Sequence, residues 1–164
     1  MADSRRSVLG MIVGAATAGL ALVYAIPAAI YLRRRRSEGE IASDLGPLAA
    51  LPERRPVRLP VIAERTDAWS HTRETMGSVF VVRTGSDVRV LDSACPHTGC
   101  SVDWDEQASA FRCPCHRSTF TIDGERTGGP AQRGLDPQEA TVKGGRVLLR
   151  YRRYRSGRAD RVPV

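Results

Sequence analysis

The residues best suited to chemistry are the cysteines and histidines, which are confined to two short segments. All four cysteines and two of the three histidines lie in Cys-Pro-His-Thr-Gly-Cys (95–100) and Cys-Pro-Cys-His (113–116). Such clustering is not a pattern of core packing. Two facing loops of this kind would present two thiolates and two imidazoles, with one further cysteine left over in each loop.

Three kinds of site use such residues. A structural zinc site would take two cysteines and two histidines, but zinc motifs usually pair cysteine with cysteine and histidine with histidine along the chain. A plain disulfide module would leave the histidines unexplained. A [2Fe–2S] centre with two cysteines on one iron and two histidines on the other, the ligand set of Rieske centres, fits both segments and their separation. We therefore favour the iron–sulfur interpretation.

The two segments resemble the motifs of Rieske iron–sulfur proteins. The resemblance implies one [2Fe–2S] cluster per chain, with its ligands at Cys95, His97, Cys113 and His116. It also implies a disulfide between Cys100 and Cys115, which subunits of quinol:cytochrome c reductases carry and Rieske ferredoxins and ring-hydroxylating oxygenases generally lack. The resemblance covers essentially the whole chain, although the motifs lie within residues 93–131.

Neighbours of the motifs are expected to tune the cluster. Ser118 matches the family serine whose hydroxyl donates to a cluster sulfide and raises the reduction potential. Phe120 stands where high-potential members have a tyrosine that donates to a cysteine sulfur. We therefore expect a potential in the middle of the Rieske range of about −150 to +300 mV, which suits menaquinol. Thr98 and Arg117 replace the leucine and glycine of many members.

A third loop and the histidines complete the predicted site. Gly128-Gly129-Pro130-Ala131 resembles the family loop that shields the cluster, where Gly129 permits close backbone approach and Pro130 stiffens the chain. A histidine on the outer iron keeps one ring nitrogen free to accept a hydrogen bond, and then the proton, from a quinol hydroxyl. The resemblance assigns this role to His116 with His97 as the second exposed ligand, whereas the residues alone do not choose between them.

The N-terminal segment has the composition of a membrane span. Residues 8–32 are 25 residues without a charge, and as a helix they would extend about 37 Å, more than the hydrocarbon core of about 30 Å. The run is longer than the apolar region of a cleaved signal peptide. Ser4-Arg5-Arg6 opens a stretch that resembles a twin-arginine export signal, with departures at Val8 and Gly10. An ordinary pair of membrane-flanking arginines is the alternative.

The topology signals conflict. Four arginines after the span and two before it would place the following domain in the cytoplasm by the positive-inside rule. The twin-arginine interpretation places that domain outside. Because the cysteine pair favours a quinol reductase subunit, we expect a single-pass protein of the bacterial inner membrane with the cluster domain on the periplasmic side.

The rest of the chain is expected to be all-β. Apolar or alternating runs separated by turns predict antiparallel strands at 57–62, 78–83, 88–91, 119–122, 141–143 and 146–149. With the resemblance, this gives a Rieske-type antiparallel β domain with a cluster-binding loop subdomain, plus one N-terminal transmembrane helix. We divide the chain into an anchor (1–36), a flexible tether (37–48) on which the domain swings, and the Rieske domain (49–164).

The charge distribution gives little support to nucleic-acid binding. The net charge of +7 comes from the two ends of the chain, since residues 1–36 and 150–161 each carry +5 and the stretch between them carries −3. A basic end can contact anionic lipid or an acidic partner, or be simply solvated.

The resemblance implies an electron-transfer subunit of a dimeric, hetero-oligomeric respiratory complex. It would take an electron coupled to a proton from a quinol bound at a cytochrome b subunit and pass the electron to a cytochrome c-type haem, without being a complete enzyme alone. Two alternatives remain open at this stage. One is the small Rieske subunit of a periplasmic molybdenum oxidase of the arsenite oxidase type, and the other is a non-redox zinc or disulfide interaction module.

Overall fold

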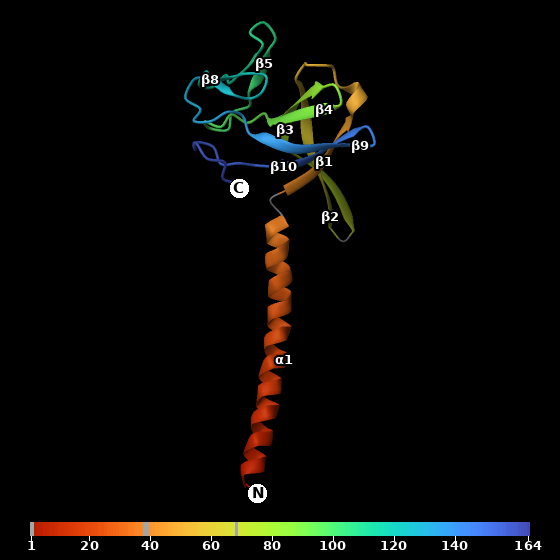
Figure 1. Cartoon of the computed structure of the whole chain (residues 1–164), viewed down its shortest axis with the longest axis vertical. Coiled ribbons are helices and arrows are strands. Elements are labelled where there is room, and N and C mark those ends of the chain that lie inside the picture. Colours follow the sequence, from red (N-terminus) through yellow and green to blue (C-terminus); the bar gives the residue numbers. More distant parts are fainter. Residues whose placement is uncertain (1, 38–39, 68) are drawn as a thin grey trace. The chain divides into compact units, whose positions relative to one another are not determined.

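The computed structural model describes residues 2–37, 40–67 and 69–164. The chain divides into two compact units, Met1–Glu38 and Gly39–Val164 (Figure 1). The first unit consists of one helix and the second is built almost entirely of strands.

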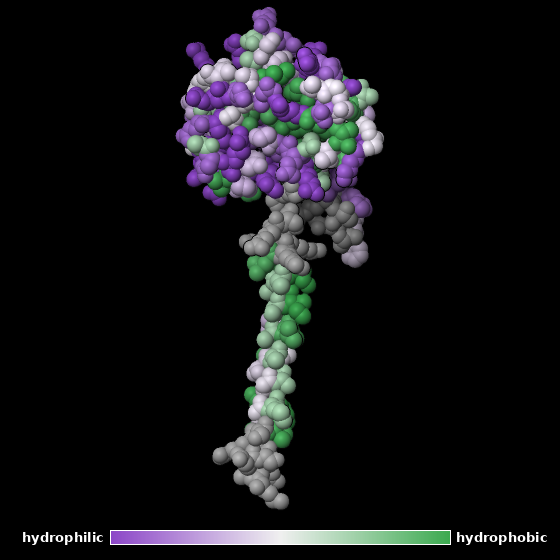
Figure 2. All heavy atoms as spheres, viewed as in Figure 1, coloured by the Kyte–Doolittle hydropathy of each residue, from purple (hydrophilic) through white to green (hydrophobic). Residues whose placement is uncertain are grey.

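The helix α1 (Ala2–Ser37) contains the predicted membrane span. Its segment Val8–Leu32 has a mean hydropathy of 2.0, and none of it is buried against protein. Figure 2 shows apolar side chains along this segment, whereas hydrophilic side chains cover much of the second unit. Exposure of so much apolar surface to water is unfavourable, and a spanning helix tolerates an internal proline such as Pro27. The helix therefore fits a single-pass membrane anchor.

A six-stranded antiparallel sheet forms the base of the second unit, in the order β1-β10-β9-β4-β3-β2. Its strands are β1 (Glu40–Pro47), β2 (Val57–Asp67), β3 (Ser70–Thr84), β4 (Asp87–Asp92), β9 (Pro137–Lys143) and β10 (Arg146–Arg152). The sheet curves until its outer strands meet, where the backbone N–H of Ile62 on β2 donates to Ser43 Oγ on β1 at 3.2 Å. A short 3-10 turn (Leu48–Ala50) connects β1 with the segment before β2. The base is thus a nearly closed barrel around an apolar core.

A smaller antiparallel sheet carries the predicted metal ligands. It contains β5 (Asp103–Asp105), β6 (Ala110–Arg112), β7 (Thr119–Phe120) and β8 (Arg126–Gly128) in this order. Phe111 and Phe120 are fully buried between it and the base, against Phe80 and Leu91. The predicted all-β fold with a separate loop subdomain is confirmed.

Most predicted strands are present, with different lengths. The closing hairpin forms at Gly144 and Gly145, whose φ values of 56° and 73° suit a tight two-residue turn. The strand predicted over 119–122 ends at Phe120, because Thr121 accepts a backbone hydrogen bond from Gly124 and starts a turn. The β5–β6 hairpin was not predicted from the sequence, since its strands of three residues are too short for an alternating pattern.

The predicted tether over 37–48 is wrong for most of its length. Residues 40–47 form β1, which pairs with β10 from Glu40↔Arg152 to Pro47↔Arg146. The polar composition, with Gly46 and Pro47, indicated a linker, but edge strands tolerate such residues and β10 offers a free edge. Only residues 38 and 39 lie between α1 and β1, and they fall outside the described residues.

A buried carboxyl group connects the base to the ligand-bearing subdomain. Asp92, at the end of β4, accepts hydrogen bonds from the Tyr151 hydroxyl at 3.1 Å and from the backbone N–H of Ala94 at 2.9 Å. Its side chain lies almost wholly inside the protein, and this burial raises the pKa of Asp92 to about 6. The native state therefore binds a proton at this carboxyl more tightly than the unfolded chain does.

We expect Asp92→Asn to change how stability depends on pH. A raised pKa means that the contribution of Asp92 to stability is complete below about pH 4 and is lost as the pH rises through about 6. The shift of about two pKa units corresponds to about 3 kcal/mol, so the variant should be more stable than the parent by up to that amount at pH 7–8. Thermal unfolding between pH 4 and 8 measures the difference. A difference that stays constant with pH contradicts the prediction.

Candidate metal centre

Two loops bring the predicted ligands together at one end of the domain. Loop 1 (93–102) connects β4 to β5, and loop 2 (113–118) connects β6 to β7. In loop 1, the backbone of Cys95 bonds that of Cys100 at 2.7 Å and that of Gly99 at 2.8 Å. In loop 2, the N–H of Cys113 donates to the carbonyl of Ser118 at 2.8 Å. Each loop is therefore a closed turn with a cysteine at its base.

The two cysteines at the loop bases are buried free thiols. Cys95 and Cys113 are 0% and 2% exposed, and neither takes part in a disulfide. Burial raises the pKa of the Cys95 thiol, and the nearby Cys113 and its hydrogen bond add to this effect. A metal bound here would replace the thiol protons and compensate the cost of two adjacent thiolates.

The two predicted histidine ligands lie beside each other. The ring centroids of His97 and His116 are 4.6 Å apart, and the rings are nearly perpendicular. The Nδ1 atom of His97 is buried without a hydrogen-bond partner, although buried polar atoms are nearly always paired. An iron ion would supply the missing partner of this atom.

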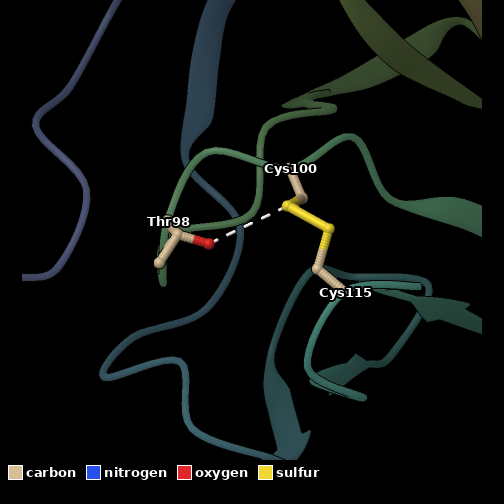
Figure 3. The surroundings of a disulfide bond; sticks show 3 residues. All are labelled: Thr98, Cys100 and Cys115. Carbon is tan, nitrogen blue, oxygen red and sulfur yellow. Dashed lines mark hydrogen bonds between the residues drawn. A yellow bond between two sulfur atoms is a disulfide. The ribbon is translucent and has the colours of Figure 1, made fainter.

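A disulfide links the tips of the two loops. Cys100 and Cys115 are bonded, with their Cα atoms 6.6 Å apart (Figure 3). The Thr98 hydroxyl lies 3.8 Å from the Cys100 sulfur. The Cys113 sulfur lies within 4.8 Å of both disulfide sulfurs, but bonded sulfurs are not thiolates. The available donors are thus two thiols and two imidazoles, a set that fits a [2Fe–2S] cluster.

A comparison with family models supports the iron–sulfur interpretation over a longer part of the chain. The model of the Rieske [2Fe-2S] domain matches residues 50–143, which include strands β2 to β9 and both ligand-bearing loops. The chain belongs to the Rieske family. The [2Fe–2S] cofactor that the ligand pattern predicted is the one this family carries. The predicted disulfide is also present in the fold.

Relatives of this Rieske protein include iron-sulfur subunits of larger complexes. The menaquinol:cytochrome c reductase iron-sulfur subunit of Bacillus subtilis is 33% identical over 98 residues, which are 57% of this chain and 58% of the relative. The cytochrome b6-f complex iron-sulfur subunit of Gloeobacter violaceus is 42% identical over 59 residues, 36% of this chain and 32% of the relative. The matches thus span about a third to three fifths of these relatives.

The fold itself occurs more widely. A quaternary ammonium Rieske monooxygenase from gut microbiota superposes with a TM-score of 0.50 at 15% identity, covering 79% of this chain and 34% of the monooxygenase. At that identity the likeness concerns the fold alone.

Ser118 of the Rieske domain is placed to donate to sulfur. It is fully buried, and its hydroxyl oxygen accepts the backbone N–H of Ala131 at 3.1 Å. Its own proton is then free to point elsewhere, and the Cys95 sulfur lies within its hydrogen-bonding reach. Sequence reasoning identified Ser118 but missed Ala131, because a backbone donor leaves no signal in residue types.

We expect Ser118→Ala to lower the reduction potential. Loss of one hydrogen bond to the cluster environment removes about 1–3 kcal/mol of preference for the reduced state, which is roughly 40–130 mV for one electron. Redox titration followed by EPR measures the shift. Ser101→Ala, an exposed serine of loop 1, is the matched control and should leave the potential unchanged. Equal potentials in the parent and Ser118→Ala would contradict the role.

The third loop packs directly against loop 2. Loop 3 (129–136) follows β8, and Gly129 has a φ of 81°. A Cβ at this position would lie 2.4 Å from the Ser118 Cα and 2.8 Å from the Arg117 carbonyl oxygen. Pro130 is exposed, while Ala131 beside it is buried. Gly129 is thus a point of close backbone approach between the two loops.

Arg117, which replaces the glycine of many family members, has an unusual backbone conformation. Its φ is 58°, in the left-handed region, where glycine is free of the steric cost that other residues bear. The family glycine at this position therefore has a conformational reason. In this chain the position bears an exposed arginine next to His116.

Proposed function

We propose that this protein is the electron-transfer subunit of a quinol:cytochrome c oxidoreductase of the bc type. The observation that carries the proposal is the histidine pair at the loop tips, 4.6 Å apart, beside the Cys100–Cys115 disulfide. Two histidines held in place by a neighbouring disulfide can contact a quinol directly. An oxygenase, by contrast, needs a closed pocket for its substrate. The relatives that are quinol reductase subunits support the same assignment.

In this proposal the four predicted ligands bind different irons according to how deeply they are buried. The buried Cys95 and Cys113 hold the inner iron, and His97 and His116 hold the outer one. The bound cluster supplies a one-electron acceptor. His116 is exposed and His97 is half-buried, so His116 is the better placed to accept a hydrogen bond from a quinol hydroxyl and to hold its proton.

The quinol is of the low-potential, menaquinol class. Phe120 is fully buried beside the ligand loops and has no group that can donate to sulfur. Ser118 then remains the hydroxyl donor of loop 2. One donor in place of two suits a potential in the middle of the Rieske range, as the relative in Bacillus subtilis named for menaquinol also suggests.

The partners are a cytochrome b subunit and a cytochrome c-type haem protein in a dimeric complex. A groove of about 630 Å³ is lined by residues of strands β1, β2, β3, β9 and β10 and contains none of the predicted ligands. We infer that the cytochrome b subunit completes the quinol site at His116. We place α1 in the bacterial inner membrane and the Rieske domain on the periplasmic side, exported through the twin-arginine signal.

EPR titration of the 164-residue chain in detergent tests this function. We expect a Rieske-type signal whose midpoint potential lies near the middle of the range and falls as the pH rises above neutrality, because reduction is coupled to histidine protonation. A potential near the top of the range would reject menaquinol. Absence of an iron signal, with zinc found instead, would overturn the electron-transfer proposal.

The midpoint potential does not identify the electron donor, which a kinetic measurement can test. Stopped-flow reduction of the oxidised chain by a menaquinol analogue should proceed slowly alone and accelerate when the chain is reconstituted with its cytochrome b subunit. Equal rates with and without cytochrome b would contradict the proposed complex.

A further inference from the structure

The C-terminal segment of the Rieske domain returns to the ligand-bearing loop. After β10, residues 153–164, here named the C-terminal arm, form a closed turn in which Arg155 N–H donates to the Val162 carbonyl at 2.9 Å. The backbone N–H of Gly157 in this arm donates to the Pro96 carbonyl at 2.8 Å. Pro96 is fully buried and lies between the predicted ligands Cys95 and His97. The arm therefore contacts the peptide that joins two ligands.

Further close approaches confirm that the arm lies along loop 1. A Cβ on Gly157 would lie 3.6 Å from the His97 carbonyl oxygen, and one on Gly99 would lie 3.5 Å from the Ser156 hydroxyl. Gly157 has a φ of 74°, a conformation that glycine adopts without strain. The arm thus covers one side of loop 1 with backbone, while the disulfide and loop 2 cover another.

One buried side chain holds the arm in this position. Arg133 of loop 3 has a side chain that is 5% exposed and forms a bidentate pair with Asp136 at 2.7–2.8 Å. Its remaining donors reach three carbonyls of the arm, those of Arg158 at 2.6 Å, Arg155 at 3.1 Å and Asp160 at 3.4 Å. A buried guanidinium with all its donors used is rigid and geometrically specific.

Two arginines of the basic C-terminus are paired with acidic groups of the same domain. Arg161 donates to Asp136 at 3.1 Å, and Arg158 pairs with Asp160 at 2.8 Å. Both arginines are therefore engaged within the domain. This favours a structural role of the arm over one in which these side chains bind anionic lipid.

We propose that Arg133 is a positioning residue for the metal centre. By holding the C-terminal arm, it keeps the Gly157–Pro96 hydrogen bond in place and fixes the backbone of loop 1 around Cys95 and His97. The inference rests on the proposed ligand roles of these two residues. We call Arg133 together with the C-terminal arm the clasp. Without the clasp, loop 1 opens more often, water reaches the peptide that joins Cys95 to His97, and the environment of the cluster changes.

Amide hydrogen exchange on the full-length chain in detergent tests the clasp directly. In the parent, we expect the amides of the arm and of 95–100 to be protected like those of the sheet. Arg133→Gln, and a truncation after Arg153, should each speed exchange in 95–100 at least tenfold. Arg150→Gln removes one exposed positive charge from β10 and, as the matched control, should leave exchange in this peptide unchanged.

The truncated chain tests the same proposal if Arg133→Gln does not fold. It leaves the Arg133–Asp136 pair whole, so no buried charge loses its partner. If neither variant folds, protection of Gly157 in the parent decides, because a rapidly exchanging Gly157 amide overturns the clasp. Exchange in 95–100 within twofold of the parent in either folded variant also overturns it.

EPR separates positioning from a general effect on stability. In Arg133→Gln and in the truncated chain we expect altered g values and a shifted midpoint potential, with Arg133→Lys intermediate because lysine cannot reproduce the bidentate pair. Faster exchange with an unchanged EPR spectrum would reject the positioning role. An absent iron signal in the parent would refute the proposed function, whereas the exchange data would still judge the clasp.

Discussion

Gly129→Ala is expected to reduce the iron content of the purified protein at least tenfold. The added Cβ would lie 2.4 Å from the Ser118 Cα, 2.7 Å from the Ser118 nitrogen and 2.8 Å from the Arg117 carbonyl oxygen. All three atoms belong to the backbone of loop 2, so no side-chain rotation relieves the clash. Loop 3 must then move away from loop 2 and break the Ala131–Ser118 hydrogen bond. We expect a loss of about 2–4 kcal/mol in stability as well.

The neighbouring glycine provides the control. Gly128 has no positive φ, and a Cβ there would meet only the Thr119 hydroxyl oxygen at 3.0 Å. Because that atom belongs to a side chain, it can shift. Gly128→Ala should therefore retain most of the iron, measured by metal analysis and the visible spectrum. Similar iron content in the two variants would show that loop 3 does not need its close approach.

Removing the disulfide is the second change with a large expected effect. The double variant Cys100→Ser/Cys115→Ser frees two loop tips separated by 15 residues in sequence. A crosslink over such a distance stabilises a fold by about 3 kcal/mol, chiefly by restricting the unfolded chain. We expect denaturant unfolding to show a loss of this size and the iron to be released faster on dilution into a chelator.

Thr98→Ala separates the covalent link from the local packing around it. The Thr98 hydroxyl lies 3.8 Å from the Cys100 sulfur (Figure 3), so this variant changes the surroundings of the disulfide and leaves the bond intact. We expect it to lose less than about 0.5 kcal/mol, the usual limit for exposed positions. A double cysteine variant as stable as Thr98→Ala would show that hydrogen bonds within each loop suffice.

The candidate site was largely predictable because its chemistry depends on residue types. Two thiols and two imidazoles at close spacing suit few purposes, and the structure brings His97 beside His116 and Cys95 beside Cys113. The apolar run at 8–32 was equally clear, since a helix of that length without charge has few places other than a bilayer. Both predictions use only local composition and spacing.

The supports of the site were not predictable in the same way. The Ala131 amide and the Pro96 carbonyl are backbone groups whose partners, Ser118 and Gly157, lie 13 and 61 residues away. Arg133 belongs to no motif. Its side chain donates to carbonyls of the C-terminal arm, a segment whose basic composition is typical of a solvated chain end. Only packing of the chain decides which of many surface arginines becomes buried.

The [2Fe–2S] chemistry, the apolar helix and the all-β class could be predicted from the amino-acid sequence, because they follow from side-chain identity and short-range periodicity. That residues 40–47 join the sheet instead of forming a tether became clear only from the fold, in which Ile41 pairs with Tyr151 from the other end of the chain. The fold likewise decided that the C-terminal arm returns to loop 1. The physical reason is that a strand edge and a backbone carbonyl accept any segment that folding brings to them, so their partners are set by topology and burial.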